Sequence, residues 1–189
     1  MGYNMKKNII KIAVSGKSGC GNTTVCKLLA GTLDLPIINF TFRSLAEERG
    51  LEFEKVLELA ATDDSWDREV DTRQVKLARE SEGCVIGSRL AVWMLEDADL
   101  KIYLTATPEV RAQRIAKREG GSIEDIARFT AERDRQDHAR YLRIYNIDTN
   151  KYDFVDMVID TNNTPPQEIA DNILKKARKI MDKKAGKQP

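Results

Sequence analysis

The chain has 189 residues, enough for one α/β domain that buries about 70% of the surface its unfolded form exposes. Its 31 Lys and Arg nearly balance 30 Asp and Glu, which argues against nucleic acid as a main partner. Cys20, Cys26 and Cys84 match neither a disulfide framework nor a zinc site, and no apolar run could span a membrane. We therefore expect a single domain over residues 1–189, cytoplasmic and monomeric, without a membrane partner.

The N-terminal part of the chain predicts a strand, a glycine-rich loop and a helix, in that order. Residues 8–14 read as a buried strand, and residues 24–30 place apolar side chains on one helical face. Between them, Gly16 and Gly21 bracket the spacing Gly-x4-Gly-x-Thr of a phosphate-binding loop. A purely structural glycine turn is the alternative, but the order of the flanking elements favours phosphate binding.

Asn22 occupies the loop position that a lysine usually holds. Backbone N–H groups and the dipole of the next helix can still bind phosphate oxygens, but the Asn22 amide carries no charge. The hydroxyl of Thr23 stands at the position that faces a metal ion. The predicted nucleotide-binding residues are Gly16, Lys17, Ser18, Gly19, Cys20, Gly21, Asn22, Thr23 and Thr24. Cations elsewhere in the chain should replace the missing lysine.

Three further side chains in or near the predicted site have less specific signals. Lys17 could supply charge to the loop, but its early position predicts a side chain that points outward. Cys20 is predicted to serve packing, with a reactive thiolate at the helix N-terminus as the alternative. His138 is predicted to face solvent rather than to take part in catalysis.

After the first helix, predicted helices and strands alternate. A strand is predicted at 36–40, followed by helical pieces over 45–61 broken at Gly50 and by a helix at 66–80 capped by 63–65. Strands follow at 84–87 and 100–104, then a helix from Pro108 and a helix over 122–145. The chain ends with a strand at 154–159, a final helix opened by Pro165 and Pro166, and a frayed tail over 183–189. We expect a three-layer α/β/α fold with a five-stranded parallel sheet and ligands at the carboxyl ends of the strands.

Arginines gather on the helix that starts at Pro108. At 100° per residue, Arg111, Arg114 and Arg118 fall within a stripe of about 60°. Three guanidinium groups on one stripe repel one another unless an anion lies there. Solvated surface is the alternative, although the missing loop lysine favours a role in phosphate binding because planar arginine forks suit bidentate phosphate contacts.

The next helix carries Arg133, Asp137 and Arg140 at positions i, i+4 and i+7, on one face. Such a face can bind a phosphate through the arginines and a base edge or a ribose through the carboxylate. The alternative for Arg133 and Asp137 is a surface ion pair of small energy.

Several blocks of the sequence resemble the short, archaeal-type cytidylate (CMP/dCMP) kinases, a branch of the P-loop nucleoside monophosphate kinases. The loop segment 21–24, Gly-Asn-Thr-Thr, is similar to the loop of that family, which also commonly lacks the lysine. The blocks at 67–74, 89–94 and 140–148 look like family blocks, so the resemblance covers nearly the whole chain.

The resemblance implies transfer of the γ-phosphoryl group of ATP to CMP or dCMP, with Mg²⁺ bridging the donor phosphates and Thr23 helping to orient it. The acceptor residues it implies are Arg43, Arg73, Arg89, Arg133, Asp137 and Arg140, with an acceptor-binding segment at about 40–80. It also implies a lid at about 111–145, from which Arg111, Arg114 and Arg118 act as catalytic residues on the transferring phosphates.

Two segments depart from the family pattern. After the second predicted strand only Phe42 and Arg43 match the usual segment, and Gly87-Ser88 stands where Glu-Gly usually precedes the Arg89 position. No acidic residue therefore ends the third predicted strand to support a metal ion.

Two alternative functions are a related P-loop kinase with another nucleotide or a small metabolite as acceptor, and a nucleotide sensor that transfers nothing. The charged face of the helix at 122–145 favours an enzyme, because a sensor has no need of acceptor-binding residues.

Overall fold

The computed structural model describes residues 9–186, whose five strands form one parallel sheet. The strands are β1 (Lys11–Gly16), β2 (Ile37–Ile38), β3 (Cys84–Gly87), β4 (Leu100–Thr105) and β5 (Met157–Asp160), in the spatial order β2-β3-β1-β4-β5. The central strand β1 pairs with β3 and β4, so that Ala13 lies opposite Ile86 on one side and Lys101 on the other. The predicted five-stranded parallel sheet is confirmed.

The helices are α1 (Asn22–Leu33), α2 (Phe42–Arg49), α3 (Phe53–Thr62), α4 (Ser65–Glu80), α5 (Ala91–Met94), α6 (Pro108–Glu119), α7 (Ile123–Tyr145) and α8 (Pro166–Ala185). Local signals account for several of their ends. Pro108 occupies the first turn of α6 behind the capping residue Thr107, and the Ser122 hydroxyl accepts from the N–H of Asp125 to cap α7. Gly50, with φ 63°, ends α2 in the left-handed conformation.

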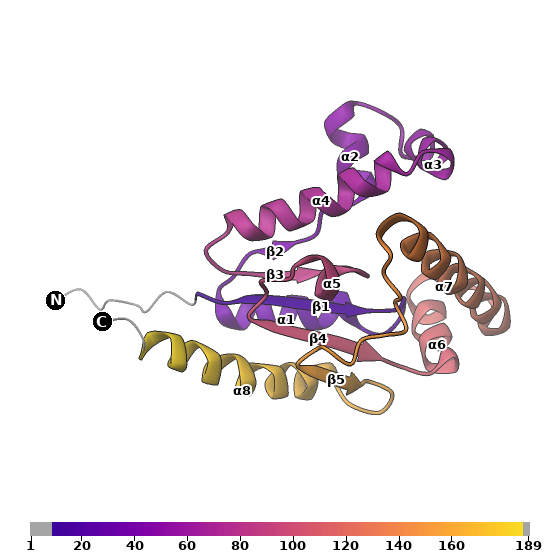
Figure 1. Cartoon of the computed structure of the whole chain (residues 1–189). Coiled ribbons are helices and arrows are strands. Elements are labelled where there is room, and N and C mark those ends of the chain that lie inside the picture. The colour runs from indigo at the N-terminus through magenta and orange to yellow at the C-terminus, as the bar shows by residue number, and fades with distance from the viewer. Residues whose placement is uncertain (1–8, 187–189) are drawn as a thin grey trace.

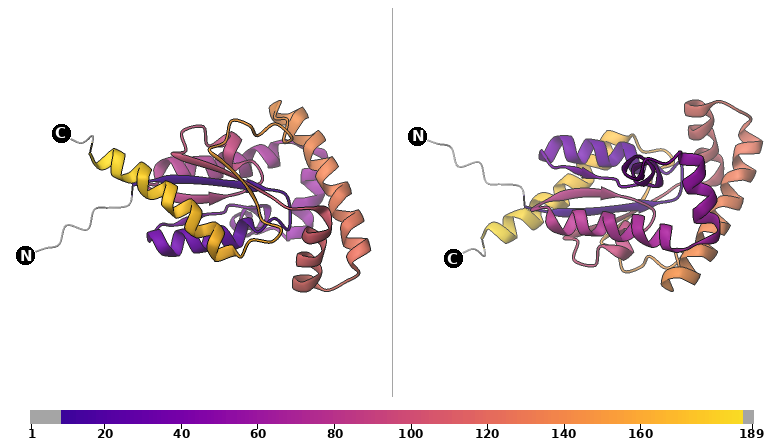
Figure 2. Two further views of the ribbon diagram at one scale, coloured as in Figure 1. Left: turned by 90° about the horizontal axis from the view of Figure 1, so that it is seen from below. Right: turned by 90° about the horizontal axis from the view of Figure 1, so that it is seen from above.

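The sheet is covered on both faces, which confirms the three-layer fold (Figures 1 and 2). Ile12 and Val14 pack into one core with α1 and α8, whereas the intervening Ala13 packs into the other core with α4 and α5. This alternation follows from the two-residue period of a strand.

Helices α6 and α7 lie together at the carboxyl ends of the strands, beyond the end to which β1 points (Figure 1). Helices α2 and α3 pack on the first half of α4 around a separate small core that includes Phe40, Val56 and Trp66. The carboxyl ends of the strands are therefore flanked by two helical regions, one formed by α2–α4 and one by α6 and α7.

Several predicted boundaries are wrong. The strand at 36–40 is reduced to Ile37–Ile38, because Phe40 leaves the sheet and is buried in the core of α2, α3 and α4. The strand at 154–159 begins only at Met157, because Phe154 packs on the Trp93 ring with centroids 5.9 Å apart. The short helix α5 was not predicted.

The last wrong boundary is the C-terminal tail. Lys183 to Ala185 are helical rather than frayed and complete α8. Asn8, the first residue of the predicted first strand, and the tail residues 187–189 lie outside the described residues. Within residues 9–186, no helix has the length and apolarity needed to cross a membrane.

Candidate active site at the carboxyl ends of the strands

The loop between β1 and α1 has a backbone that only glycine fits well. Gly19 and Gly21 have φ angles of 83° and 98°, in the left-handed region that side chains disfavour. A Cβ added at Gly16 would lie 2.6 Å from the carbonyl oxygen of Leu104, and one at Gly19 would lie 2.9 Å from Cβ of Arg111. The loop is therefore held close to β4 and α6, with the N-terminus of α1 directly behind it.

Asn22 closes this loop from within. Its Nδ2 donates to the buried carbonyl of Gly16 at 2.7 Å, which joins the two ends of the loop. The amide donor that faces a phosphate at a lysine position is thus engaged by the protein itself. Asn22 Oδ1 is buried without a hydrogen-bond partner among the described residues.

A cavity of about 600 Å³ opens over the loop, and all nine predicted nucleotide-binding residues line it. The other lining residues are Val25, Gly87, Ser88, Arg89, Arg114, Arg118, Thr161, Thr164, Pro166 and Ile169. The cavity thus extends from the loop and the turn after β3 to the first turn of α8. Its volume is within the range typical of small-molecule sites.

Arg89 connects the loop to α7. Its Nη2 donates to the hydroxyl of Ser18 at 2.6 Å, and its Nη1 forms an ion pair with Asp137. The turn that carries Arg89 is fixed by the buried Ser15, whose hydroxyl donates to Ser88 O at 2.8 Å and accepts from Val92 N at 3.1 Å. A side chain of the central strand therefore sets the position of the guanidinium.

The predicted acceptor residues of α7 lie together. The Asp137 carboxylate accepts from Arg140 at 2.8 Å and lies 4.0 Å from Arg133. Arg140 Nε lies 3.2 Å from the buried carboxylate of Asp67 on α4. Three of the implied acceptor residues, Arg89, Asp137 and Arg140, therefore form one cluster, and Arg133 lies at its edge.

Arg43 and Arg73, the other two implied acceptor residues, lie apart from this cluster. The Arg43 guanidinium stacks 4.2 Å above the Phe53 ring, and Arg73 donates to the carboxylate of Glu48 at 3.1 Å. Both arginines belong to the region of α2–α4, and their contacts there are with its own side chains.

Two carboxylates on α4 have raised pKa values. Burial raises the pKa of Asp67, although the nearby Arg140 opposes that rise. Burial also raises the pKa of Asp71 to about 6, while a hydrogen bond of 2.8 Å from the Tyr145 hydroxyl opposes the rise. These carboxylates join α4 to the C-terminal half of α7.

The arginines of α6 are held by groups of the protein. Arg111 is buried, donates to Ser18 O at 3.2 Å and forms a 2.7 Å ion pair with Asp134. Arg114 donates to the hydroxyl and the carbonyl of Thr161 and to Gly19 O. The counter-anion for Arg111 is thus Asp134 of the same chain.

Arg118 is the most exposed of the three α6 arginines and pairs with its neighbour Glu119. Arg114 and Arg118 line the large cavity, whereas Arg111 lies behind the loop and lines none of the described cavities. The stripe predicted from the sequence therefore contains two arginines that a ligand in the cavity could contact and one that supports the loop.

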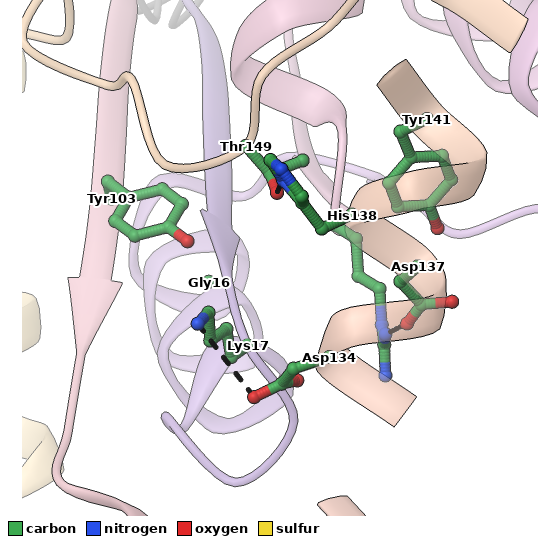
Figure 3. A pocket seen from close by; sticks show the side chains of 9 residues that line it. Gly16, Lys17, Tyr103, Asp134, Asp137, His138, Tyr141 and Thr149 are labelled. Carbon is green, nitrogen blue, oxygen red and sulfur yellow. Dashed lines mark hydrogen bonds and ion pairs between the residues drawn. The ribbon is translucent and has the colours of Figure 1, made fainter. Parts of the chain in front are cut away.

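A small pocket of about 30 Å³ lies beside the loop, between β1, β4 and α7 (Figure 3). Lys17 points into it toward Asp134, with Nζ 3.9 Å from the carboxylate, so the predicted outward orientation is wrong. His138 also lines the pocket, with Nδ1 3.0 Å from the Thr149 hydroxyl, instead of facing solvent as predicted.

Burial raises the pKa of the Cys20 thiol, which supports packing rather than a reactive thiolate.

Three structural residues of the site were missed by sequence reasoning: Ser15, Asp134 and Thr161. The Thr161 hydroxyl donates to Cys20 O and Thr105 O, each at 3.0 Å, and so ties the loop to the ends of β4 and β5. A threonine directly after the last strand, where ligands gather in such sheets, was the available signal. Asp134 could have been found from its place three residues before Asp137, on the same face of α7.

No group of three or more potential metal ligands among His, Cys, Asp and Glu occurs within residues 9–186. The exposed Thr23 lines the large cavity, so its hydroxyl is available to a metal ion there. One protein oxygen is enough for Mg²⁺, which keeps several waters and binds mainly through substrate phosphates with one or two protein oxygens.

Comparison with known proteins gives the family of the chain and agrees with the fold. Residues 11–163 match the model of the "Cytidylate kinase-like family". The chain is 46% identical over 164 residues to "Cytidylate kinase 2" of Borreliella afzelii, covering 85% of this chain and 92% of the relative. It is 43% identical over 167 residues to "Cytidylate kinase" of Pyrococcus abyssi, covering 87% and 92%.

Among solved structures, shikimate kinase from Acinetobacter baumannii in complex with shikimate superimposes with a TM-score of 0.63 at 17% identity, covering 92% of this chain and 95% of that one. Likeness at this identity supports the fold alone. The match of the family model and the identity to cytidylate kinases of bacteria and archaea, over most of each chain, show that this chain belongs to the cytidylate kinase-like family.

Proposed function

We propose that the protein transfers the γ-phosphoryl group of ATP to CMP or dCMP, giving CDP or dCDP. The observation that carries this proposal is the position of Arg89, which hydrogen-bonds to the glycine-rich loop through Ser18 and pairs with Asp137 on α7. One guanidinium thus joins a loop suited to donor phosphates and a charged face suited to a nucleoside monophosphate.

The donor would occupy the cavity of about 600 Å³, with its phosphates on the backbone N–H groups of the loop. Gly19, Gly21, Asn22 and Thr23 supply the N–H groups that bind the β-phosphate in this scheme. Mg²⁺ bound with ATP, next to the Thr23 hydroxyl, would neutralise charge on the donor phosphates.

The acceptor would bind between α4 and α7, where Arg89, Arg133 and Arg140 contact its phosphate and Asp137 contacts the cytosine or the ribose. The acceptor oxygen belongs to a phosphate that is ionised at pH 7, so no general base is needed. The site then acts by positioning the reactants and stabilising charge, which suits a cluster rich in arginine.

The region at about 40–80 would serve as the acceptor-binding segment, and residues at about 111–145 as a lid. Closure of α6 and α7 would bring Arg114 and Arg118 onto the transferring phosphates and exclude water, which would otherwise hydrolyse ATP. Arg111, our third catalytic candidate, would act from behind the loop by holding it against α6. Arg43 and Arg73 could join the acceptor only if they leave their present partners.

The test is a turnover panel of the purified protein with ATP, Mg²⁺ and one acceptor at a time: CMP, dCMP, UMP, AMP or shikimate. We expect CMP and dCMP to be phosphorylated with the highest kcat/KM, measured as ADP release and as product by chromatography. Preference for another acceptor would disprove the cytidylate assignment, and ATP binding without transfer to any acceptor would indicate a sensor.

A further inference from the structure

The large cavity over the loop and the small pocket beside it meet at one place. Within residues 9–186, only Gly16, Lys17 and Arg89 line both of them. The large cavity holds the donor in the proposed function, and the small pocket is lined by Asp137 and so belongs to the acceptor side. A phosphoryl group that moves from one ligand to the other must pass this junction, and Lys17 and Arg89 are the two cations there.

The ammonium of Lys17 is available to a ligand at this junction. Its side chain is 45% exposed, and Asp134 at 3.9 Å is its one charged partner among residues 9–186. That carboxylate already accepts a 2.7 Å hydrogen bond from Arg111. Because Arg111 neutralises Asp134, the cluster keeps a net positive charge, which the Lys17 ammonium presents beside the loop.

The loop offers no other cation of its own. Asn22 is uncharged, and its Nδ2 is engaged with Gly16 O at 2.7 Å. Arg111 is buried behind the loop. Arg114 is occupied by Thr161 and Gly19 in this conformation. Lys17 is therefore the loop side chain that can supply the charge that Asn22 does not.

We propose that Lys17 is a catalytic residue whose ammonium contacts the phosphoryl group during transfer, and that Asp134 is the positioning residue that holds it at the junction; this proposal rests on the proposed function. In the step, the bond between the γ-phosphorus and the β–γ bridging oxygen breaks, and its electron pair remains on the β-phosphate of ADP. A new bond forms between that phosphorus and an oxygen of the acceptor phosphate. Lys17 donates hydrogen bonds to the equatorial oxygens and transfers no proton.

The test compares Lys17→Met with Lys27→Met, a matched substitution at an exposed lysine of α1. For Lys17→Met we expect kcat with ATP and CMP to fall by about 10²–10³-fold, the loss typical of one transition-state donor, with little change in the KM for CMP. Lys17→Arg, which keeps a cation, should retain more of the rate than Lys17→Met. Lys27→Met should match the wild type.

A second measurement separates contact with the transferred group from a structural role. Calorimetric titration should show that Lys17→Met weakens binding of ATP more than binding of ADP, because only ATP places a phosphate at the junction. A general distortion of the loop would weaken both nucleotides equally, and that result would overturn the proposal. A fall in kcat of less than about tenfold would overturn it too.

The two proposals fail in distinguishable ways. If the wild type phosphorylates no cytidylate, the proposed function fails, and Lys17 is then judged by the difference between ATP and ADP binding alone. If the wild type is active and Lys17→Met is as fast, only the role of Lys17 fails.

Discussion

At the scale of single residues, Asn22 shows how a loop can keep its shape without the usual lysine. Its side chain spans the loop and donates to the buried carbonyl of Gly16. A buried carbonyl without a partner is costly, so this hydrogen bond stabilises the loop conformation on which phosphate binding depends. The side-chain donor at this position therefore contacts the protein itself.

Replacing Asn22 with alanine removes this hydrogen bond. We expect Asn22→Ala to lower the free energy of unfolding by about 1 kcal/mol, measured by urea denaturation, and to weaken ATP binding. Asn172→Ala, at an exposed site on α8, is the matched control and should leave both quantities unchanged. Wild-type stability together with wild-type ATP affinity in Asn22→Ala would contradict this role.

At the scale of secondary-structure elements, α4 and α7 are joined by polar contacts along the proposed acceptor side of the site. Asp67 pairs with Arg140, Tyr145 donates to Asp71, and Arg68 donates to Ile144 O. These contacts bring carboxylates close together in a partly buried seam, and burial raises the pKa of both Asp67 and Asp71. These contacts orient the charged face of α7, but burial makes the ionised form of the carboxylates in the seam unfavourable.

The raised pKa of Asp71, about 6, makes the stability of the fold depend on pH. An unfolded aspartate has a pKa near 4, so between about pH 4 and pH 6 the native state holds a proton that the unfolded state has lost. The stabilisation is complete below about pH 4 and is lost as the pH rises through 6. Asp71→Asn cannot ionise and still accepts from Tyr145, so it should gain about 1–3 kcal/mol relative to the wild type across this window.

This gain is measured by urea unfolding of the wild type and Asp71→Asn at pH 4, 5, 6 and 7. Asp153→Asn, at an exposed aspartate, is the control and should show a constant difference from the wild type. A constant difference for Asp71→Asn as well would show that its carboxyl has an ordinary pKa.

At the scale of the whole molecule, the site lies where three parts of the chain meet at one edge of the sheet. The loop after β1 lines the large cavity, the turn after β3 supplies Arg89, and α7 supplies the charged face (Figure 1). Arg89 is bonded to the other two parts through Ser18 and Asp137. A ligand that pairs with Arg89 therefore links regions that are far apart in the sequence.

Ligand binding should raise the thermal stability of the molecule through this link. At a concentration of 100 times Kd, CMP should add about 2.7 kcal/mol, and each kcal/mol raises Tm by about 2–4 °C in a protein of this size. We expect Arg89→Ala to lose most of the CMP-induced shift in a thermal-melt assay. Arg135→Ala, an exposed arginine of α7 paired with Glu132, should keep it; an equal CMP shift in both variants would remove Arg89 from the acceptor site.

Apart from the short helix α5, the sequence by itself determined the order of strands and helices along the chain, the position of the glycine-rich loop and the charged face of α7. These features depend on local patterns: the period of apolar residues, glycines at positions with positive φ, and charged residues spaced by one or two helical turns. The same patterns predicted the break at Gly50 and the start of α6 at Pro108, because such signals act within a few residues.

Only the tertiary structure decided which charged groups neutralise one another. Asp134 pairs with Arg111 across 23 positions, Arg89 bonds to Ser18 across 71, and Thr161 reaches Cys20 O across 141. Asp134 also explains the inward direction of Lys17, since its carboxylate attracts the Lys17 ammonium. Local sequence patterns do not encode such contacts, because they form only when the sheet brings the ends of β1, β3, β4 and β5 together with α6 and α7.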